Sequence, residues 1–170
     1  MSSEKFKRYV IDTIILLKEL VNNAKNNNQK KIANGYAKGV IMGYYSIITL
    51  LKHEAFVFCI DQNELGLADI NPDVDLLDLG KNRDIDFEED NWSIDVINEE
   101  KIKGYLNDVI TLLKEQAREA KKEADNPKEG YEDYNKGELM AYSSLFSLLK
   151  HQASVFHIDE KEIGVFDIEV

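Results

Sequence analysis

The sequence has little cysteine and no long apolar run. These two features exclude an internal disulfide and a membrane-spanning helix. Its single cysteine, Cys59, cannot form an internal disulfide. No apolar run approaches the ~20 residues that a membrane-spanning helix needs. The opening residues, MSSEKFKRYV, lack the succession of charged, apolar and small residues that marks a signal peptide. We therefore expect a cytoplasmic protein that does not bind a membrane.

Sequence signatures of common catalytic and cofactor sites are also missing. There is no Gly-rich phosphate loop, no Ser nucleophile motif and no paired cysteines of a zinc site. The chain has neither the Glu-x-x-His pair of di-metal bundles nor a His-Glu-x-x-His helix. Most carboxylates fall on expected solvent faces, so no acid–base pair stands out. These absences favour a protein that is not an enzyme and that carries no cofactor.

Negative charge is in excess and is unevenly distributed. The formal net charge is -11. Residues 69–100 hold 12 acidic and 2 basic side chains, a net of -10, whereas residues 1–68 have a net of +3 and residues 101–170 a net of -4. This field disfavours direct binding of nucleic acid, whose backbone attracts Lys and Arg. It favours a basic protein partner.

The sequence contains the same unit twice. HEAFVFCID at 53–61 reappears as HQASVFHID at 151–159, and IILLKE at 14–19 reappears as ITLLKE at 110–115. The offset is 98 residues for the first match and 96 for the second. A doubled unit predicts pseudo-two-fold packing. It also separates repeated residues, which serve a shared architecture, from unrepeated residues, which are candidates for function.

Each unit is expected to contain two helices, because apolar residues recur at spacings of three and four. The four stretches with this pattern are 4–25, 30–58, 99–124 and 131–157. The run Asn26-Asn27-Asn28 is expected to end the first helix, and Asp125-Asn126-Pro127 the third. The short connections make each pair an antiparallel hairpin.

The predicted fold class is all-α, with two tandem helical hairpins in a pseudo-two-fold four-helix bundle. Residues 1–70 form the first hairpin repeat, 71–98 a long acidic connector and 99–170 the second repeat, within one compact domain. Gly39 and Gly137 share a helical face with other repeated residues, and they would let two helix backbones come close.

Both units end in the same way. The segments 61–66 and 159–164 carry an Asp-x-x-Glu pattern that resembles a capping box and predicts a single helical turn. A glycine ends each segment, where a left-handed residue is needed. The tails that follow, 67–70 and 165–168, are predicted to be short strands that pair with each other.

The strongest unrepeated feature lies in the connector, which alternates acidic with apolar residues. Charge would steer a basic partner to it, and its aromatic residues would supply the buried anchor. The predicted partner-binding residues are Asp84, Asp86, Phe87, Glu88, Glu89, Asp90 and Trp92. The plainer interpretation is a solvated linker whose apolar residues cover the helices. A homodimer formed through apolar connector residues is left open.

Two functions are therefore predicted. The leading one is a non-enzymatic acidic protein that inhibits or sequesters a basic protein, as immunity proteins, antitoxins and nucleic-acid mimics do; this analogy is one of composition only. The alternative is a helical bundle that binds a metal or small ligand through His53, His151 and His157 at the repeat interface. The plainer interpretation of these histidines is a hydrogen-bonded or half-exposed side chain near a helix end.

Overall fold

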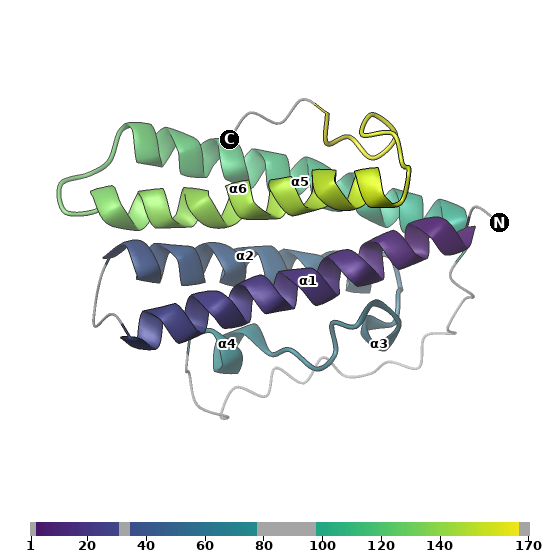
Figure 1. The fold of residues 1–170 in the computed structure, drawn as a ribbon, viewed down its shortest axis with the longest axis horizontal. Helices are drawn as coiled ribbons and strands as arrows, with labels where there is room; N and C mark the ends of the chain where they lie inside the picture. The colour runs from purple at the N-terminus through teal and green to yellow at the C-terminus, as the bar shows by residue number, and fades with distance from the viewer. Residues whose placement is uncertain (1–2, 31–34, 78–97, 167–170) are drawn as a thin grey trace.

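The computed structural model describes residues 3–30, 35–77 and 98–166, including side chains except those of residues 3 and 27–30. Six helices pack together within these ranges, and none of the residues in them lies in a strand. They are α1 (Ser3–Lys30), α2 (Gly35–Val57), α3 (Gln62–Leu65), α4 (Pro72–Asp75), α5 (Glu99–Asp125) and α6 (Glu132–Val155) (Figure 1). The predicted all-α class is confirmed.

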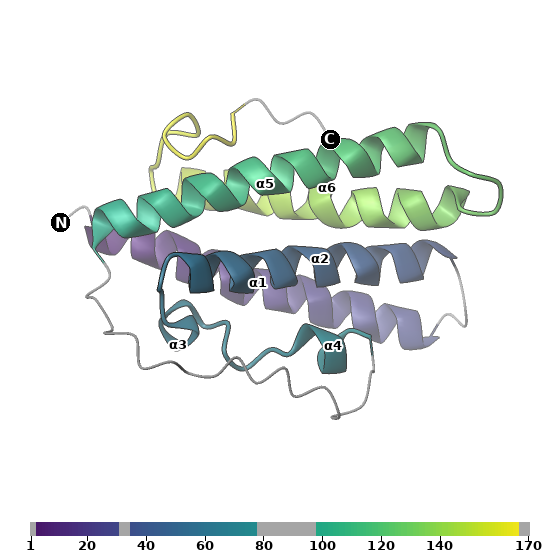
Figure 2. The same cartoon turned by 180° about the vertical axis from the view of Figure 1, so that it is seen from behind.

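The long helices α1, α2, α5 and α6 lie alongside one another (Figure 1, Figure 2). α1 and α5 run in one direction along the molecule, and α2 and α6 run in the other. The most extensive contact between two helices is that of α2 with α6. α3 packs against α1 and α2, and α4 packs against α2. No helix in the described part of the chain is both long and apolar enough to cross a membrane.

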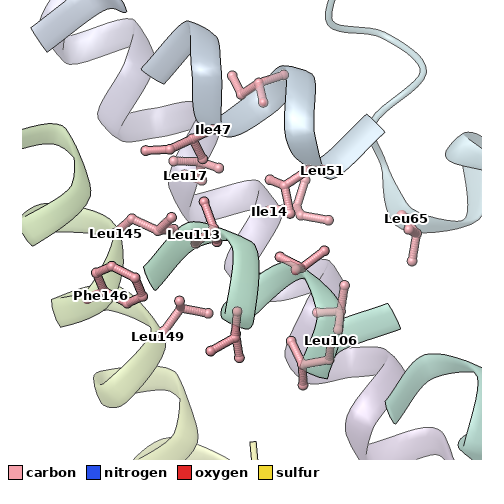
Figure 3. Packing of buried hydrophobic residues seen from close by; sticks show 14 of the residues in the cluster. Ile14, Leu17, Ile47, Leu51, Leu65, Leu106, Leu113, Leu145, Phe146 and Leu149 are labelled. Carbon is pink, nitrogen blue, oxygen red and sulfur yellow. The ribbon is translucent and has the colours of Figure 1, made fainter. Parts of the chain in front are cut away.

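The core takes one apolar stripe from each long helix. Figure 3 shows side chains from all of them turned toward a common interior. The largest fully buried side chains include Tyr9, Leu17, Ile47, Ile48, Leu65, Tyr105, Ile110, Leu113 and Leu145. Burying one such side chain contributes about 1.5–3 kcal/mol relative to leaving it exposed. The 3.6-residue periodicity of the sequence therefore accounts for the core.

The backbones of α2 and α6 come into direct contact at two glycines. A Cβ atom placed on Gly39 would stand 1.9 Å from the carbonyl oxygen of Tyr134, and one on Gly137 would stand 2.0 Å from that of Tyr36. Real Cβ atoms do not approach an atom so closely, so only glycine fits at either position. The predicted close approach at Gly39 and Gly137 is confirmed.

Two buried tyrosines join α1 to α6 and α5 to α2. The Tyr9 hydroxyl donates to the backbone carbonyl of Leu149 at 3.1 Å, and the Tyr105 hydroxyl donates to that of Leu51 at 3.2 Å. The two tyrosines are 96 residues apart and the two leucines 98 apart, the offsets of the sequence repeat. Positions matched by the repeat therefore make matching contacts.

A second matched pair of contacts joins helix starts to helix ends. Lys5 Nζ donates to the carbonyl of His157 at 2.7 Å, and Lys101 Nζ donates to that of Cys59 at 3.2 Å. Cys59 and His157 follow α2 and α6 in a left-handed conformation, with φ of 48° and 52°. Because a cation suits the C-terminal end of a helix, each lysine stabilises the helix end that it contacts.

The turns predicted at 61–66 and 159–164 differ from each other. Residues 62–65 form α3, where the Asp61 side chain accepts a hydrogen bond from the backbone N–H of Asn63 at 2.8 Å. Residues 159–164 form hydrogen-bonded turns instead of a helix. Asp159 nevertheless accepts from the backbone N–H of Lys161 at 2.9 Å, which is the same capping contact.

The short strand predicted at 67–70 does not form. These residues lie in a turn, and Lys52 Nζ donates to the carbonyls of Leu67 and Ile70 at 3.1 and 2.7 Å. A side chain thus occupies the acceptors that a strand ladder would need. The second tail is described only as far as Phe166, and neither of its described residues is in a strand.

One helix prediction also needs correction, and the connector contains a helix that was not predicted. α1 continues through Asn26-Asn27-Asn28 to Lys30, because asparagine costs no more than about 0.7 kcal/mol per residue in a helix and carries no stop signal of its own. The predicted connector 71–98 begins with the short helix α4. The Asn71 side chain caps it by accepting from the backbone N–H groups of Asp73 and Val74, and proline fits at its first turn.

Candidate functional site

The residues predicted to bind a basic partner lie outside the described residues. This applies to the whole set: Asp84, Asp86, Phe87, Glu88, Glu89, Asp90 and Trp92. The described chain stops at Leu77 and resumes at Asn98. The Asn98 side chain accepts from the backbone N–H of Lys101 at 2.8 Å and caps α5. The end of the connector is therefore fixed to the start of a long helix.

The start of the connector is tied to α1 and α2. The Tyr45 hydroxyl donates to Oδ1 of Asp73 in α4 at 3.1 Å. Lys18 of α1 forms a hydrogen-bonded ion pair with Asp69. The hydrogen bond lowers the pKa of the Asp69 carboxyl. Burial lowers the pKa of the Lys52 ammonium, which holds the carbonyls of the preceding turn. Both flanks of the acidic segment are therefore anchored to long helices.

The three histidines of the alternative metal site are all exposed. His53 places Nδ1 3.1 Å from Oε1 of Glu54, a buried carboxylate. His151 holds the matching position in α6, and His157 follows that helix. In the ranges that the structure describes, no three metal-ligating side chains come together. The geometry therefore offers the metal alternative no assembled ligand set.

A groove of about 250 Å³ opens to solvent between α2, α5 and α6. We call it the acidic groove. It is lined by Ser46 of α2, by Gln116, Glu119, Ala120 and Glu123 of α5, and by Glu138 and Tyr142 of α6. The buried Tyr142 hydroxyl donates to Oε1 of Gln116 at 3.2 Å, which ties α6 to α5 at the groove. Three glutamates thus line the groove, and one of them, Glu119, forms an ion pair with Lys122 at 3.2 Å.

The charges in the acidic groove act on one another. Burial raises the pKa of the Glu138 carboxyl, and the neighbouring charge of Glu123 raises it further. Burial also raises the pKa of Tyr142 to about 12; the charge of Glu138 adds to this, and a hydrogen bond with Ser46 opposes it. Within the described chain, no basic side chain contributes to either shift. Glu123 and Glu138 therefore each raise the pKa of a neighbouring group in the groove.

Sequence reasoning missed the acidic groove, although a comparison of the two halves contains the signal. Three lining positions are identical in both halves: Ser46, Ala120 and Tyr142 match Ser144, Ala24 and Tyr44. The other four are uncharged in the first half: Gln116, Glu119, Glu123 and Glu138 match Leu20, Asn23, Asn27 and Val40. The frame of the groove is repeated, and its carboxylates are not.

Comparison with known proteins finds no relative. No protein-family model matches the chain, and neither a curated protein nor a solved structure matches it.

Proposed function

We propose that the chain is a non-enzymatic acidic binding protein that inhibits or sequesters a basic protein partner. The observation that carries the proposal is the concentration of charge: residues 69–100 hold 12 acidic and 2 basic side chains in a chain of net charge -11. A field of one sign steers a partner of the opposite sign and fixes its orientation. Phe87 and Trp92 stand within the acidic run, and aromatic residues of this kind dominate binding energy at interfaces.

The frame for this function is a tandem repeat of two helical hairpins, 1–70 and 99–170, that form one pseudo-two-fold bundle. The matched tyrosine contacts support this frame. So do two matched ion pairs, Lys7 with Glu64 at 2.7 Å and Lys103 with Glu162 at 3.0 Å. Residues 71–98 then cross from one hairpin to the other. We place the protein in the cytoplasm, where its one free cysteine would stay reduced.

Anchored flanks favour this binding mode over a plain linker. The contact of Tyr45 with Asp73 holds the start of the connector to α2, and the connector ends at Asn98, the N-cap of α5. Fixed ends reduce the conformational entropy that the intervening chain loses on binding.

A pull-down from native lysate tests the proposal. The intact chain is compared with a connector variant in which Asp84, Asp86 and Asp90 become Asn, Glu88 and Glu89 become Gln, and Trp92 becomes Ala. The control variant neutralises five exposed acids elsewhere: Asp12, Glu19, Asp108, Glu115 and Glu129. The total charge of the two variants is the same, so a difference between them reports the connector residues and not the total charge.

We expect one basic protein, identified by mass spectrometry, to be retained by the intact chain and by the control variant but not by the connector variant. Moderate salt should release it, because screening weakens attraction between exposed charges. Equal retention by all three chains, or retention of a protein that is not basic, would contradict the proposal.

A further inference from the structure

The contact between α2 and α6, which we call the seam, is the most extensive one between two helices. It joins the first helix pair, α1 with α2, to the second helix pair, α5 with α6 (Figure 1, Figure 2). It is also more extensive than the contact of α1 with α2 or that of α5 with α6. The helices α2 and α6 therefore pack more against the other helix pair than within their own.

The two sides of the seam present nearly the same surface. Tyr44 forms a side-chain hydrogen bond with Ser144, and Tyr142 forms one with Ser46. The members of the second bond lie 98 positions from those of the first, in the offset of the repeat. The close approaches of the two seam glycines are matched in the same way. Each helix pair thus offers the contacts that it receives.

Two positions of the seam meet their own counterparts in the repeat. A Cβ atom on Gly35 would stand 3.5 Å from Cβ of Asp133, and one on Gly43 would stand 2.6 Å from Cβ of Ala141. The members of each contact are 98 residues apart. These contacts therefore lie close to the axis that relates the two helix pairs.

Gly43 opposite Ala141 decides which helix pairs fit together. If two second pairs met in this geometry, Ala141 would face Ala141 with the Cβ atoms 2.6 Å apart, which is closer than real Cβ atoms come. If two first pairs met, Gly43 would face Gly43, and the packing contacts of the Ala141 methyl group would be lost. Only unlike pairs place one methyl group in the space for one.

We infer that the seam is an interaction surface for a second copy of the chain, and that Gly43 and Ala141 restrict it to unlike helix pairs. The first pair of one copy packs on the second pair of the other, and the remaining two pairs do the same. Exchange of identical elements costs little, because every contact of the monomer is kept. This inference is independent of the proposed function, which concerns the connector.

Protein concentration sets the balance between the monomer and this exchanged dimer. Within one chain, a short tether holds its two ends at an effective concentration of about millimolar. The 20 residues from 78 to 97 reach at most roughly 70 Å when extended, whereas α2, with 23 residues, is about 35 Å long. The tether therefore does not oblige the two helix pairs of one chain to meet. Exchange is expected when the chain refolds at about millimolar concentration.

Disulfide trapping of the full chain tests the inference. All chains carry Cys59→Ser, which removes the exposed native thiol. One chain carries Gly35→Cys and the other Asp133→Cys, because 3.5 Å between the Cβ positions suits a disulfide. The two chains are unfolded together in urea, refolded at high concentration and oxidised in a glutathione buffer. A single chain with both substitutions should form an intrachain disulfide and so checks the geometry.

We expect the mixed chains to give about tenfold or more covalent dimer than Asp133→Cys alone, because two second helix pairs would be overpacked at the seam. Gly35→Cys mixed with Glu115→Cys measures random collision, since Glu115 is exposed on α5 and is not among the neighbours of Gly35. The inference is overturned if the mixture gives no more covalent dimer than this control, or no more than Asp133→Cys alone.

A further substitution tests the selection of unlike pairs. Ala141→Gly removes the methyl group that would clash, so the Asp133→Cys chain with this change should form clearly more covalent dimer with itself. An unchanged yield would overturn the role of Gly43 and Ala141.

The intact chain provides a second readout that needs no substitution. Light scattering after refolding should show a dimer with the helix content of the monomer at high protein concentration, and a monomer at low concentration. Circular dichroism measures the helix content of the intact chain and of the cysteine variants, so a chain that fails to fold is recognised. A monomer at both concentrations would overturn the inference.

Discussion

Gly39 in α2 lies so close to the carbonyl of Tyr134 in α6 that there is no space for one more carbon atom. The same relationship recurs 98 residues later, between Gly137 and the carbonyl of Tyr36. These two contacts set the distance between the helices that flank the acidic groove.

Replacing either glycine by alanine should destabilise the protein strongly. A Cβ atom would have to move a backbone carbonyl, and overpacking of this kind costs about 1–3 kcal/mol or more. Gly35→Ala is the control in the same helix, because its Cβ would meet its nearest neighbours at an ordinary 3.5 Å. Urea unfolding should show a large loss for Gly39→Ala and Gly137→Ala and a change within about 0.5 kcal/mol for Gly35→Ala. Equal losses at all three positions would contradict the close approach.

Tyr9→Phe and Tyr105→Phe should each reduce the free energy of unfolding by about 1 kcal/mol. Each change removes one buried hydrogen bond and keeps the ring, and such bonds contribute about 0.5–1.5 kcal/mol. The two reductions in the free energy of unfolding should be similar, because the two contacts are matched in the repeat. Tyr131→Phe, at an exposed position, serves as the control. A loss at only one of the buried tyrosines would argue against matched roles.

Alkaline pH should unfold the protein through its buried tyrosines. Burial raises the pKa of Tyr9, with Glu160 adding to it, and burial raises that of Tyr105, with Glu54 adding to it. The pKa of Tyr142 rises to about 12, from burial first and then from Glu138. A raised folded-state pKa contributes stability that is complete below the unfolded pKa of about 10 and is lost above it.

Each of these tyrosines should therefore lower the free energy of unfolding by up to about 1.4 kcal/mol per pH unit above pH ~10. Urea unfolding from pH 8 to pH 11 measures this, and ultraviolet absorbance of tyrosinate follows the ionisation. Tyrosinate absorbance from these residues should appear together with unfolding. If all tyrosines ionised fully near pH 10 while the chain stayed folded, this prediction would be contradicted.

Glu138→Gln should stabilise the protein at neutral pH. Burial, and then the charge of Glu123, raises the pKa of Glu138, so the folded state favours the protonated carboxyl. The stability that this raised pKa contributes is complete below the pKa of Glu138 in the unfolded chain. It is lost as the pH rises through the pKa of Glu138 in the folded chain. The variant should thus raise the unfolding temperature more at pH 7 than at pH 4. Glu115→Gln, at an exposed position of α5, should show no such difference.

Much of the fold could be predicted from the periodicity of apolar residues. The spacing of Ile14 and Leu17 located α1, and the same spacing located the other long helices, because burying an apolar stripe dominates helix stability. The end of α1 was missed because three asparagines carry only a small propensity cost. The strand at 67–70 was wrong because one side chain, Lys52, takes the carbonyls, and no local pattern reveals such a long-range contact.

The candidate site was harder to predict. Glu119 and Glu123 lie on one face of α5, and their spacing is typical of the solvent-exposed face of a helix. Their relation to Glu138 depends on how α6 packs against α5, which periodicity does not specify. Comparing each position with its partner in the other half would have singled out these residues. The predicted residues of the connector remain a prediction, since they lie outside the described chain.

The central claim is that charge in residues 84–90 selects a basic protein. The most direct measurement is the dissociation constant of the purified partner at several salt concentrations, for the intact chain and for the connector variant. We predict tight binding by the intact chain that weakens steeply with salt, and weak binding by the variant with little salt dependence. The same affinity and the same salt dependence for both chains would contradict the claim.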